Sequence, residues 1–253
     1  MSNPANRRWP WPRVIAHRGG GQFAPENTLA ALRKGHALGF RGVEFDVMLS
    51  ADAVPVLIHD ETLERTTSGR GNVADTAAAV LTTLDAGAWF DARYGGEPVP
   101  QFADAACLCL SLGLWANIEI KPAEGHEAAT GRIVAMMAAE IWKDSAPGLV
   151  PLLSSFSEAA LAAARIAAPQ LPRGLLLDAV PGDWHARMTA LDCASLHCNQ
   201  ARLDERGARE IVDAGYGLAT WTVNDPVAAR RLVAWGVDAM FTDRLDVIGP
   251  DFR

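Results

Sequence analysis

Residues 218–242 read LATWTVNDPVAARRLVAWGVDAMFT, and this stretch decides the fold. Its first apolar run, 218–223, predicts a strand, a helix follows over 226–235, and a second apolar run predicts another strand over 239–242. Asp225 and Pro226 are typical of a helix start, whereas Gly236 is typical of the position just past a helix end. Two strands joined by a helix pair in parallel through a right-handed crossover, so the stretch predicts one βαβ unit.

The same alternation continues along almost the whole chain. Further strands are predicted over 14–17, 42–49, 54–59, 115–121, 152–156, 174–177 and 195–198, and further helices over 28–38, 103–112, 128–142, 158–167 and 205–214. Gly39, Gly113 and Gly215 follow three of these helices as left-handed caps. Eight such units without a compositional break predict a closed (β/α)8 barrel, the TIM barrel, and 253 residues is a usual length for one. We expect a single domain over 1–253.

One segment breaks the alternation. Between the second barrel strand and the helix at 103–112, the chain has a predicted strand pair and the run Thr66-Thr67-Ser68-Gly69-Arg70-Gly71 where a single helix is expected. We interpret residues 54–101 as a small insertion on the catalytic face of the barrel. Its expected apolar contacts come from Leu81, Leu84, Trp89 and Phe90.

Charge and composition limit the partners. The net charge of -7 disfavours a nucleic-acid backbone or an anionic membrane as the main partner, although a small anionic substrate stays possible. Residues 1–12 contain no apolar run of signal-peptide length, and no stretch approaches the roughly 20 apolar residues of a membrane span. Cys107, Cys109, Cys193 and Cys198 lack zinc-site spacing, so we expect buried thiols and a cytoplasmic location.

Three carboxylates occur near the ends of predicted strands. Glu44 and Asp46 are two residues apart on one strand, so their side chains point the same way, and Glu119 interrupts the apolar run 116–120. In a barrel these strand ends share one mouth. Oxygen ligands alone indicate a hard cation, Mg²⁺ or Ca²⁺. The alternative is that the carboxylates form salt bridges with cations such as Arg18, Lys121 or Arg41.

Two histidines end strands beside this group. His17 ends the first strand and His59 the strand that opens the insertion, so one could donate a proton while the other accepts one. His36, His126 and His185 have the pattern of packing or surface residues, and His197 is left open between the barrel interior and a substrate contact.

Other residues at these strand ends suit the binding of a phosphorylated ligand. Arg18 and Lys121 have the chemistry of phosphate clamps. Trp221 could be an apolar wall for substrate or plain core, and the run from Gly19 to Gly21 would let the backbone approach a ligand.

Together these motifs resemble the signature of glycerophosphodiester phosphodiesterases. The resemblance is carried by His17-Arg18-Gly19, Ala24-Pro25-Glu26-Asn27-Thr28, Glu44-x-Asp46, Pro55-Val56-x-x-His59-Asp60, Leu63-x-Arg65-Thr66-Thr67, Glu119-x-Lys121, Thr220-Trp221-Thr222-Val223-Asn224 and Phe241-Thr242-Asp243-Arg244. It covers nearly the whole chain and is greatest with the cytosolic bacterial enzymes linked to glycerol-3-phosphate uptake. Leu245 departs from the pattern, because many relatives have proline there.

The resemblance implies a TIM barrel with a small insertion after the second strand. It implies metal-dependent hydrolysis of glycerophosphodiesters to sn-glycerol 3-phosphate and an alcohol. Glu44, Asp46 and Glu119 would hold the metal, His17 and His59 would be the acid–base pair, and Arg18 and Lys121 would bind phosphate.

Several alternatives stay open from the sequence. The attacking group could be water or the glycerol 2-hydroxyl, and a related lyase or transferase would stop at a cyclic phosphate. Lys121 could form a Schiff base, although Glu119 on the same face argues against nucleophilic use. A non-catalytic barrel that only binds phosphodiesters is a third possibility. The oligomeric state is open, as is whether Trp9 and Trp11 cap the barrel or join a partner.

Overall fold

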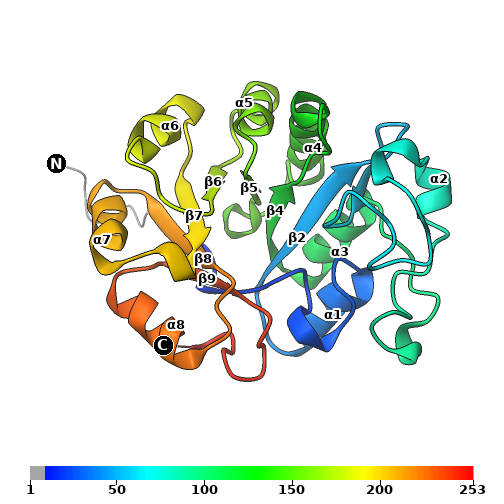
Figure 1. Ribbon diagram of the computed structural model, residues 1–253, viewed down its shortest axis with the longest axis horizontal. Coiled ribbons are helices and arrows are strands. Elements are labelled where there is room, and N and C mark those ends of the chain that lie inside the picture. The colour runs from blue at the N-terminus through cyan, green and yellow to red at the C-terminus, as the bar shows by residue number, and fades with distance from the viewer. Residues whose placement is uncertain (1–8, 253) are drawn as a thin grey trace.

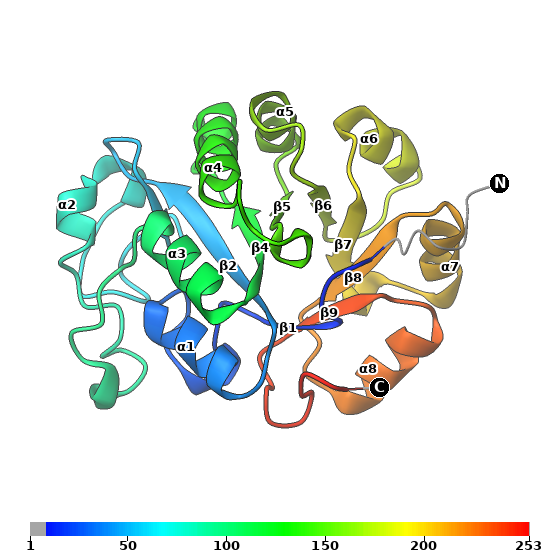
Figure 2. The ribbon, with the colours of Figure 1, turned by 180° about the vertical axis from the view of Figure 1, so that it is seen from behind.

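Eight parallel strands close into a barrel in the computed structural model, which describes residues 9–252 (Figures 1 and 2). The barrel strands are β1 (Val14–Ala16), β2 (Gly42–Leu49), β4 (Trp115–Ile120), β5 (Leu152–Ser155), β6 (Arg173–Leu177), β7 (Ser195–Asn199), β8 (Gly217–Trp221) and β9 (Ala239–Thr242). Closure comes from β1, which pairs with both β9 and β2. The predicted TIM barrel is confirmed; residues 1–8 and 253 of the predicted domain lie outside the described residues.

Helices surround the barrel on its outside (Figure 1). They are α1 (Leu29–Ala37), α3 (Phe102–Leu112), α4 (Glu127–Ile141), α5 (Glu158–Ala167), α6 (Trp184–Leu191), α7 (Glu205–Asp213) and α8 (Pro226–Ala234). The Asp225 carboxylate accepts hydrogen bonds from the amides of Val227 and Ala228, which confirms the predicted start of α8. Gly236, like the glycines after three other helices, has a positive φ angle as predicted. The predicted strands and helices agree with the structure to within two residues at each end, but α6 was not predicted.

Inward-facing side chains fill the barrel at the amino ends of its strands. Ile15, Trp115 and Leu152 pack there against Trp9, which is only 7% exposed. The Trp9 ring lies 6.0 Å from that of Trp115, and its indole N–H donates to the Pro12 carbonyl oxygen. Trp9 therefore caps the closed end of the barrel. The sequence had left open whether it caps the barrel or joins a partner.

The segment predicted as an insertion forms irregular structure beside the barrel mouth. It contains β3 (Pro55–Leu57) and α2 (Ala78–Leu81), and it packs around an apolar cluster that includes Leu81 and Leu84. Trp89 and Phe90, also expected there, lie outside this cluster but pack edge to face against each other, with ring centroids 5.8 Å apart, although Trp89 is 42% exposed. Whether the segment is an insertion relative to other barrels stays a prediction.

The strand β2 runs past the barrel wall and turns back as a hairpin. Its residues pair with β4 only as far as Val47, whereas β3 pairs antiparallel with β2 and returns the chain toward the mouth. The amide of Ile58 donates to the carbonyl of Asp46, 3.2 Å away. The hairpin therefore brings His59 level with Asp46.

Two smaller expectations, on the cysteines and on the glycine run, have mixed outcomes. Cys109, Cys193 and Cys198 are buried, and burial raises the pKa of each thiol to about 12, but Cys107 is exposed, contrary to prediction. A side chain at Gly21 would collide with the main chain of Asp243, so glycine is required there by a neighbouring backbone, and an approach to a ligand stays a prediction.

The remaining observations concern the last loop and the helices. Leu245, where many relatives have proline, is 5% exposed and belongs to the main apolar core. Among residues 9–252, no helix combines the length and apolar character needed to cross a membrane.

Candidate active site

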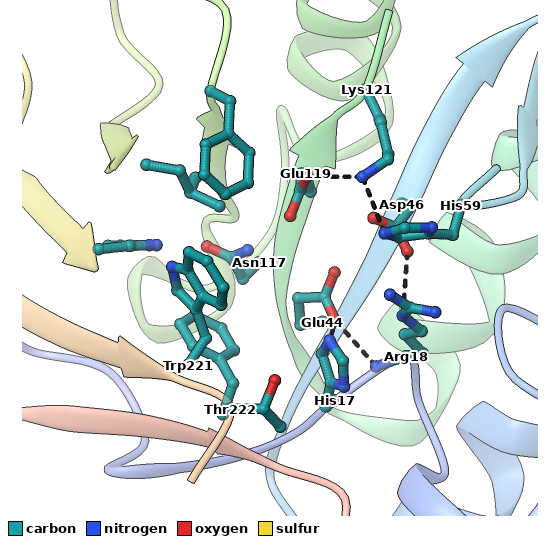
Figure 3. A pocket seen from close by; sticks show the side chains of 14 residues that line it. His17, Arg18, Glu44, Asp46, His59, Asn117, Glu119, Lys121, Trp221 and Thr222 are labelled. Carbon is teal, nitrogen blue, oxygen red and sulfur yellow. Dashed lines mark hydrogen bonds and ion pairs between the residues drawn. The ribbon is translucent and has the colours of Figure 1, made fainter. Parts of the chain in front are cut away.

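Three carboxylates converge inside the barrel near its mouth (Figure 3). Glu44 and Asp46 come from β2 and Glu119 from the neighbouring β4, and the strand register places Asp46 opposite Glu119. One oxygen from each carboxylate lies within 4.8 Å of the others, and all three side chains are buried. The structure therefore brings together the three residues predicted as metal ligands.

The electrostatics of this group suit a bound cation. Burial, reinforced by the negative charge of Asp46, raises the pKa of Glu44 well above its ordinary value and that of Glu119 to about 8. Glu44 Oε1 is buried without a hydrogen-bond partner. A hard divalent cation fits this donor set, because it would compensate the charge and coordinate the free oxygen.

The salt bridges considered as the alternative are partly present. Arg18 Nε lies 3.6 Å from Asp46 Oδ2, and Lys121 Nζ lies 3.7 Å from Glu119 Oε1. Arg41 is exposed just before the amino end of β2, at the other end of the barrel. Arg18 and Lys121 thus neutralise part of the charge without replacing a cation at Glu44.

Each candidate catalytic histidine is held by a carboxylate on one ring nitrogen. His17 Nδ1 lies 2.7 Å from Asp243 Oδ1, and His59 Nδ1 lies 2.6 Å from Asp60 Oδ1. His17 Nε2 is 3.9 Å from Glu44, and Lys121 Nζ donates to His59 Nε2 over 2.8 Å. The second nitrogen of His17 therefore faces Glu44, whereas that of His59 faces the Lys121 ammonium group, and both rings line the cavity beside the carboxylates.

The sequence analysis missed the roles of these partners. Asp60 directly follows His59, so the adjacency was a usable signal, but Asp243 lies 226 positions from His17. Asn224 donates to Asp243 Oδ2 and so keeps that carboxylate in place. The hydrogen bond from His17 lowers the pKa of Asp243 despite its burial.

An ion-pair network around Arg65 holds Asp60, the carboxylate partner of His59, in place. Arg65 hydrogen-bonds to both Asp60 and Glu26, and its hydrogen bonds hold the pKa of Asp60 well below its usual range. Arg18 Nη1 donates to Glu26 Oε1 over 2.6 Å. The network links His59 to Arg18 and restricts the positions of both.

A cavity of about 150 Å³ opens in front of these groups. Its lining comes from all sides of the barrel and comprises His17, Arg18, Glu44, Asp46, His59, Asn117, Glu119, Lys121, Phe156, Leu176, His197, Trp221, Thr222 and Phe241. Trp221 and Phe156 pack edge to face, with ring centroids 5.5 Å apart. Every predicted site residue therefore lines one cavity.

The other histidines separate into two groups. His36, His126 and His185 are exposed, as expected. His197 is completely buried in the barrel interior and also lines the cavity, and its contact with substrate stays a prediction. Burial lowers its pKa to about 3, which keeps the imidazole neutral.

A parallel barrel whose mouth combines buried carboxylates, two anchored histidines and two cations belongs to the class of barrel enzymes that act on phosphate esters. Comparison with known proteins narrows this class. The model of the glycerophosphoryl diester phosphodiesterase family matches residues 17–247, and the chain belongs to that family. It is accordingly a glycerophosphodiester phosphodiesterase.

Individual relatives agree with this assignment over most of their length. The chain is 32% identical to a glycerophosphodiester phosphodiesterase of Caldanaerobacter subterraneus, over 91% of this chain and 93% of the relative. It is 40% identical to an Oleispira antarctica phosphodiesterase solved with the product sn-glycerol-3-phosphate, with a TM-score of 0.87 over 92% and 94% of the two chains. An Agrobacterium tumefaciens glycerophosphodiester phosphodiesterase structure is 30% identical, with a TM-score of 0.77 over 93% and 98%.

Proposed function

We propose that this protein hydrolyses glycerophosphodiesters to sn-glycerol 3-phosphate and an alcohol, with one divalent cation, Mg²⁺ or Ca²⁺, held by Glu44, Asp46 and Glu119. The observation that carries the proposal is the pair of anchored histidines on either side of these carboxylates. The product bound to the Oleispira antarctica relative supports the choice of substrate.

The proposed roles follow from the geometry. A bound cation would supply Lewis acidity that neutralises charge on a phosphate oxygen. Arg18 and Lys121 bind other phosphate oxygens, and Lys121 has three N–H donors, so it can hold His59 and phosphate together. His59 Nε2 already accepts a hydrogen bond, which suits a proton acceptor. His17 then donates a proton to the departing alcohol.

Two routes are compatible with these roles. In the first, His59 takes a proton from water as the water oxygen bonds to phosphorus, and the bond from phosphorus to the alcohol oxygen breaks. In the second, His59 takes the proton of the glycerol 2-hydroxyl, whose oxygen displaces the alcohol and leaves a cyclic phosphate for water to open. In both, the alcohol oxygen receives its proton from His17.

The net charge and the cysteines support a proposal about the partner and the cellular location of the protein. We propose that the chain works as one domain on a small molecule, without a nucleic acid or a membrane as partner, because its net charge is -7. Its four cysteines are free, as is usual in a reducing compartment, which supports a cytoplasmic location.

The decisive experiment is an assay of the purified protein on glycerophosphocholine. Release of sn-glycerol 3-phosphate, measured with its dehydrogenase, should require Mg²⁺ or Ca²⁺ and stop with chelator. Choline should appear in equal amount. Accumulation of a cyclic phosphate would point to a lyase outcome, and no turnover with either cation would reject the proposed reaction.

A further inference from the structure

The two carboxylates on β2 each have one oxygen held by the loop between β1 and α1. The main-chain N–H of Arg18 donates to Glu44 Oε2 over 2.8 Å (Figure 3), and Asn27 Nδ2 donates to Asp46 Oδ2 over the same distance. Glu44 Oε1 is buried without a partner, and within residues 9–252 no hydrogen bond engages Asp46 Oδ1. Each carboxylate therefore has one oxygen occupied and one available to a cation.

Asn27 contributes to the position of both carboxylates. Its side chain donates to Asp46 Oδ2 and, through Oδ1, also accepts the Asp46 main-chain N–H over 3.0 Å. Its own main-chain N–H donates to the Arg18 carbonyl oxygen over 3.1 Å. Asn27 thus fixes Asp46 directly, and it supports the hydrogen bond to Glu44 through the main chain of Arg18.

Backbone and side chain together restrict the residue type at position 27. The φ angle of Asn27 is +57°, in the left-handed region that glycine, asparagine and aspartate adopt most readily. Among these three, only asparagine has an amide that donates to a carboxylate and accepts an N–H at the same time. Asn27 is 4% exposed, so water competes little for these hydrogen bonds.

The same two-point contact recurs at a second aspartate of the site. Asn224 Nδ2 donates to Asp243 Oδ2 over 2.9 Å, and Asn224 Oδ1 accepts the Asp243 main-chain N–H over 2.8 Å. The other oxygen, Asp243 Oδ1, contacts His17. An asparagine that occupies Oδ2 therefore leaves Oδ1 of the same aspartate for a functional contact.

We infer that Asn27 is a positioning residue for the cation, because it occupies Asp46 Oδ2 and so presents Asp46 Oδ1 beside the free oxygen of Glu44. The inference rests on the proposed function, which places the cation at these carboxylates. Their oxygens lie within 4.8 Å of one another, so without a cation they repel each other. Asn27 holds Asp46 in the binding arrangement against this repulsion, which strengthens cation binding.

The test measures the cation affinity of the full-length protein by calorimetry, with Mg²⁺ alone and with Ca²⁺ alone. Asn27→Gly keeps the left-handed backbone but removes the amide, and we expect it to raise the Kd by about tenfold to a hundredfold. Asn27→Ser, whose hydroxyl is too short to make both contacts with Asp46, is a milder second variant and should raise the Kd by about threefold or more. Circular dichroism in chelator checks the fold of both.

Kinetics at varied cation concentration distinguish positioning from a general loss of structure. At saturating cation, kcat of Asn27→Gly on glycerophosphocholine should return to within about threefold of the wild type, because the bound cation itself restrains Asp46. A general loss of structure would lower kcat at every cation concentration.

Asn224→Ala is the matched control, because it removes the same two-point contact from an aspartate outside the three-carboxylate group. Its cation Kd should stay within about twofold of the wild type. Its kcat should fall, since Asp243 then orients His17 poorly, and saturating cation should not restore it.

The outcomes separate the two proposals. An unchanged Kd in folded Asn27→Gly and Asn27→Ser would overturn the inference, and metal-dependent hydrolysis by the wild type would leave the proposed reaction standing. A kcat of folded Asn27→Gly that stays low at saturating cation would also overturn it. A raised Kd in the variants without turnover by the wild type would keep the inference and reject the reaction. A wild type that binds neither cation would reject both.

Discussion

His17 and His59 face the cavity with the nitrogen opposite the one that a carboxylate holds. Asp243 fixes the first ring and Asp60 the second, so both imidazoles are oriented before substrate binds. A preorganised proton donor and acceptor lower the barrier without the cost of ordering them during the reaction. The proposed acid–base chemistry therefore depends on two side chains and on the carboxylates that orient them.

Replacing either histidine by alanine should abolish most of the activity. We expect His17→Ala and His59→Ala each to lower kcat by roughly 10²–10⁴, because proton transfer in the transition state is lost. Steady-state kinetics on glycerophosphocholine measures this, and far-ultraviolet circular dichroism checks the fold. His126→Ala, at an exposed position, is the control. Near-normal kcat in either variant would remove that histidine from its role.

Binding of a cation should stabilise the fold through the three carboxylates. At a concentration of 100 times its Kd, Mg²⁺ or Ca²⁺ should add about 2.7 kcal/mol to the free energy of unfolding. Glu44→Gln should lose this gain, yet match or exceed the wild type in chelator, because repulsion among the carboxylates is relieved. Thermal unfolding with and without cation measures both effects.

The control for the cation experiment is Glu124→Gln. Glu124 is an exposed carboxylate near the mouth and lies outside the three-carboxylate group, so this variant should keep the full metal-induced gain. A gain that survives in Glu44→Gln would place the cation elsewhere.

The buried His197 should make the fold sensitive to acid. Its folded pKa is lowered to about 3 by burial, whereas an unfolded imidazole titrates near 6.5. The unfolded state therefore binds the proton first as pH falls. The stability that the neutral ring contributes is complete above about pH 6.5 and is lost progressively toward pH 3.

We expect the free energy of unfolding of the wild type to fall more steeply than that of His197→Asn between about pH 6.5 and 4. The difference in slope should approach about 1.4 kcal/mol per pH unit, which corresponds to one proton. Urea unfolding at several pH values measures it. Parallel slopes in the two proteins would show that His197 does not contribute.

At the scale of elements, two segments outside the regular barrel units shape the site. The hairpin of β2 and β3 brings His59 to Asp46, and the chain before β1 places Trp9 under the barrel interior. The hairpin positions a proposed catalytic histidine, whereas Trp9 closes the core, so loss of each should have a different consequence.

Trp9→Ala should destabilise the protein while leaving the active site intact. Loss of a buried tryptophan costs about 3–5 kcal/mol, and Trp9 contacts no carboxylate or catalytic histidine of the mouth. Chemical unfolding and kcat at low temperature measure the two effects. Ile166→Ala, at a side chain that is 80% exposed, is the control and should change stability by less than about 0.5 kcal/mol. Equal stability losses in the two variants would contradict a capping role.

At the scale of the whole molecule, the barrel gives the cavity one closed end and one open end. The amino ends of the strands are filled by Trp9 and Trp115, whereas the mouth is bordered by loops and by Phe156, which is 45% exposed. A substrate therefore has one end enclosed and the other near solvent, so selection should differ between its two ends.

We expect the protein to discriminate only weakly between substrates that differ in the alcohol head group at the open end of the cavity. We expect kcat/KM to vary by less than about a hundredfold among the choline, ethanolamine and glycerol esters, because loose contacts give small differences in transition-state binding. Parallel assays of the three diesters, all read through sn-glycerol 3-phosphate, measure this. A preference of a hundredfold or more would require a specific head-group site at the mouth.

The sequence by itself predicted the barrel and most of its site. Strands and helices were recognisable because apolar periodicity and end signals such as Asp225, Pro226 and Gly236 act over short distances along the chain. Glu44, Asp46 and Glu119 were recognisable because carboxylates interrupt apolar runs, where an unpaired charge is costly. The short helices α2 and α6 were missed, because neither has a side-chain cap at its start and so few residues carry little local pattern.

Only the tertiary structure decided which groups meet. Asp243 reaches His17 across 226 positions because β1 and β9 pair to close the barrel, and His59 reaches Asp46 because β2 turns back on itself. Asn117, His197 and Trp221 line one cavity although nothing in their local sequences connects them. Local sequence patterns indicate whether a segment forms a helix or a strand and which of its residues are buried. Contacts between distant residues depend instead on strand order and register, which are set only when the barrel closes.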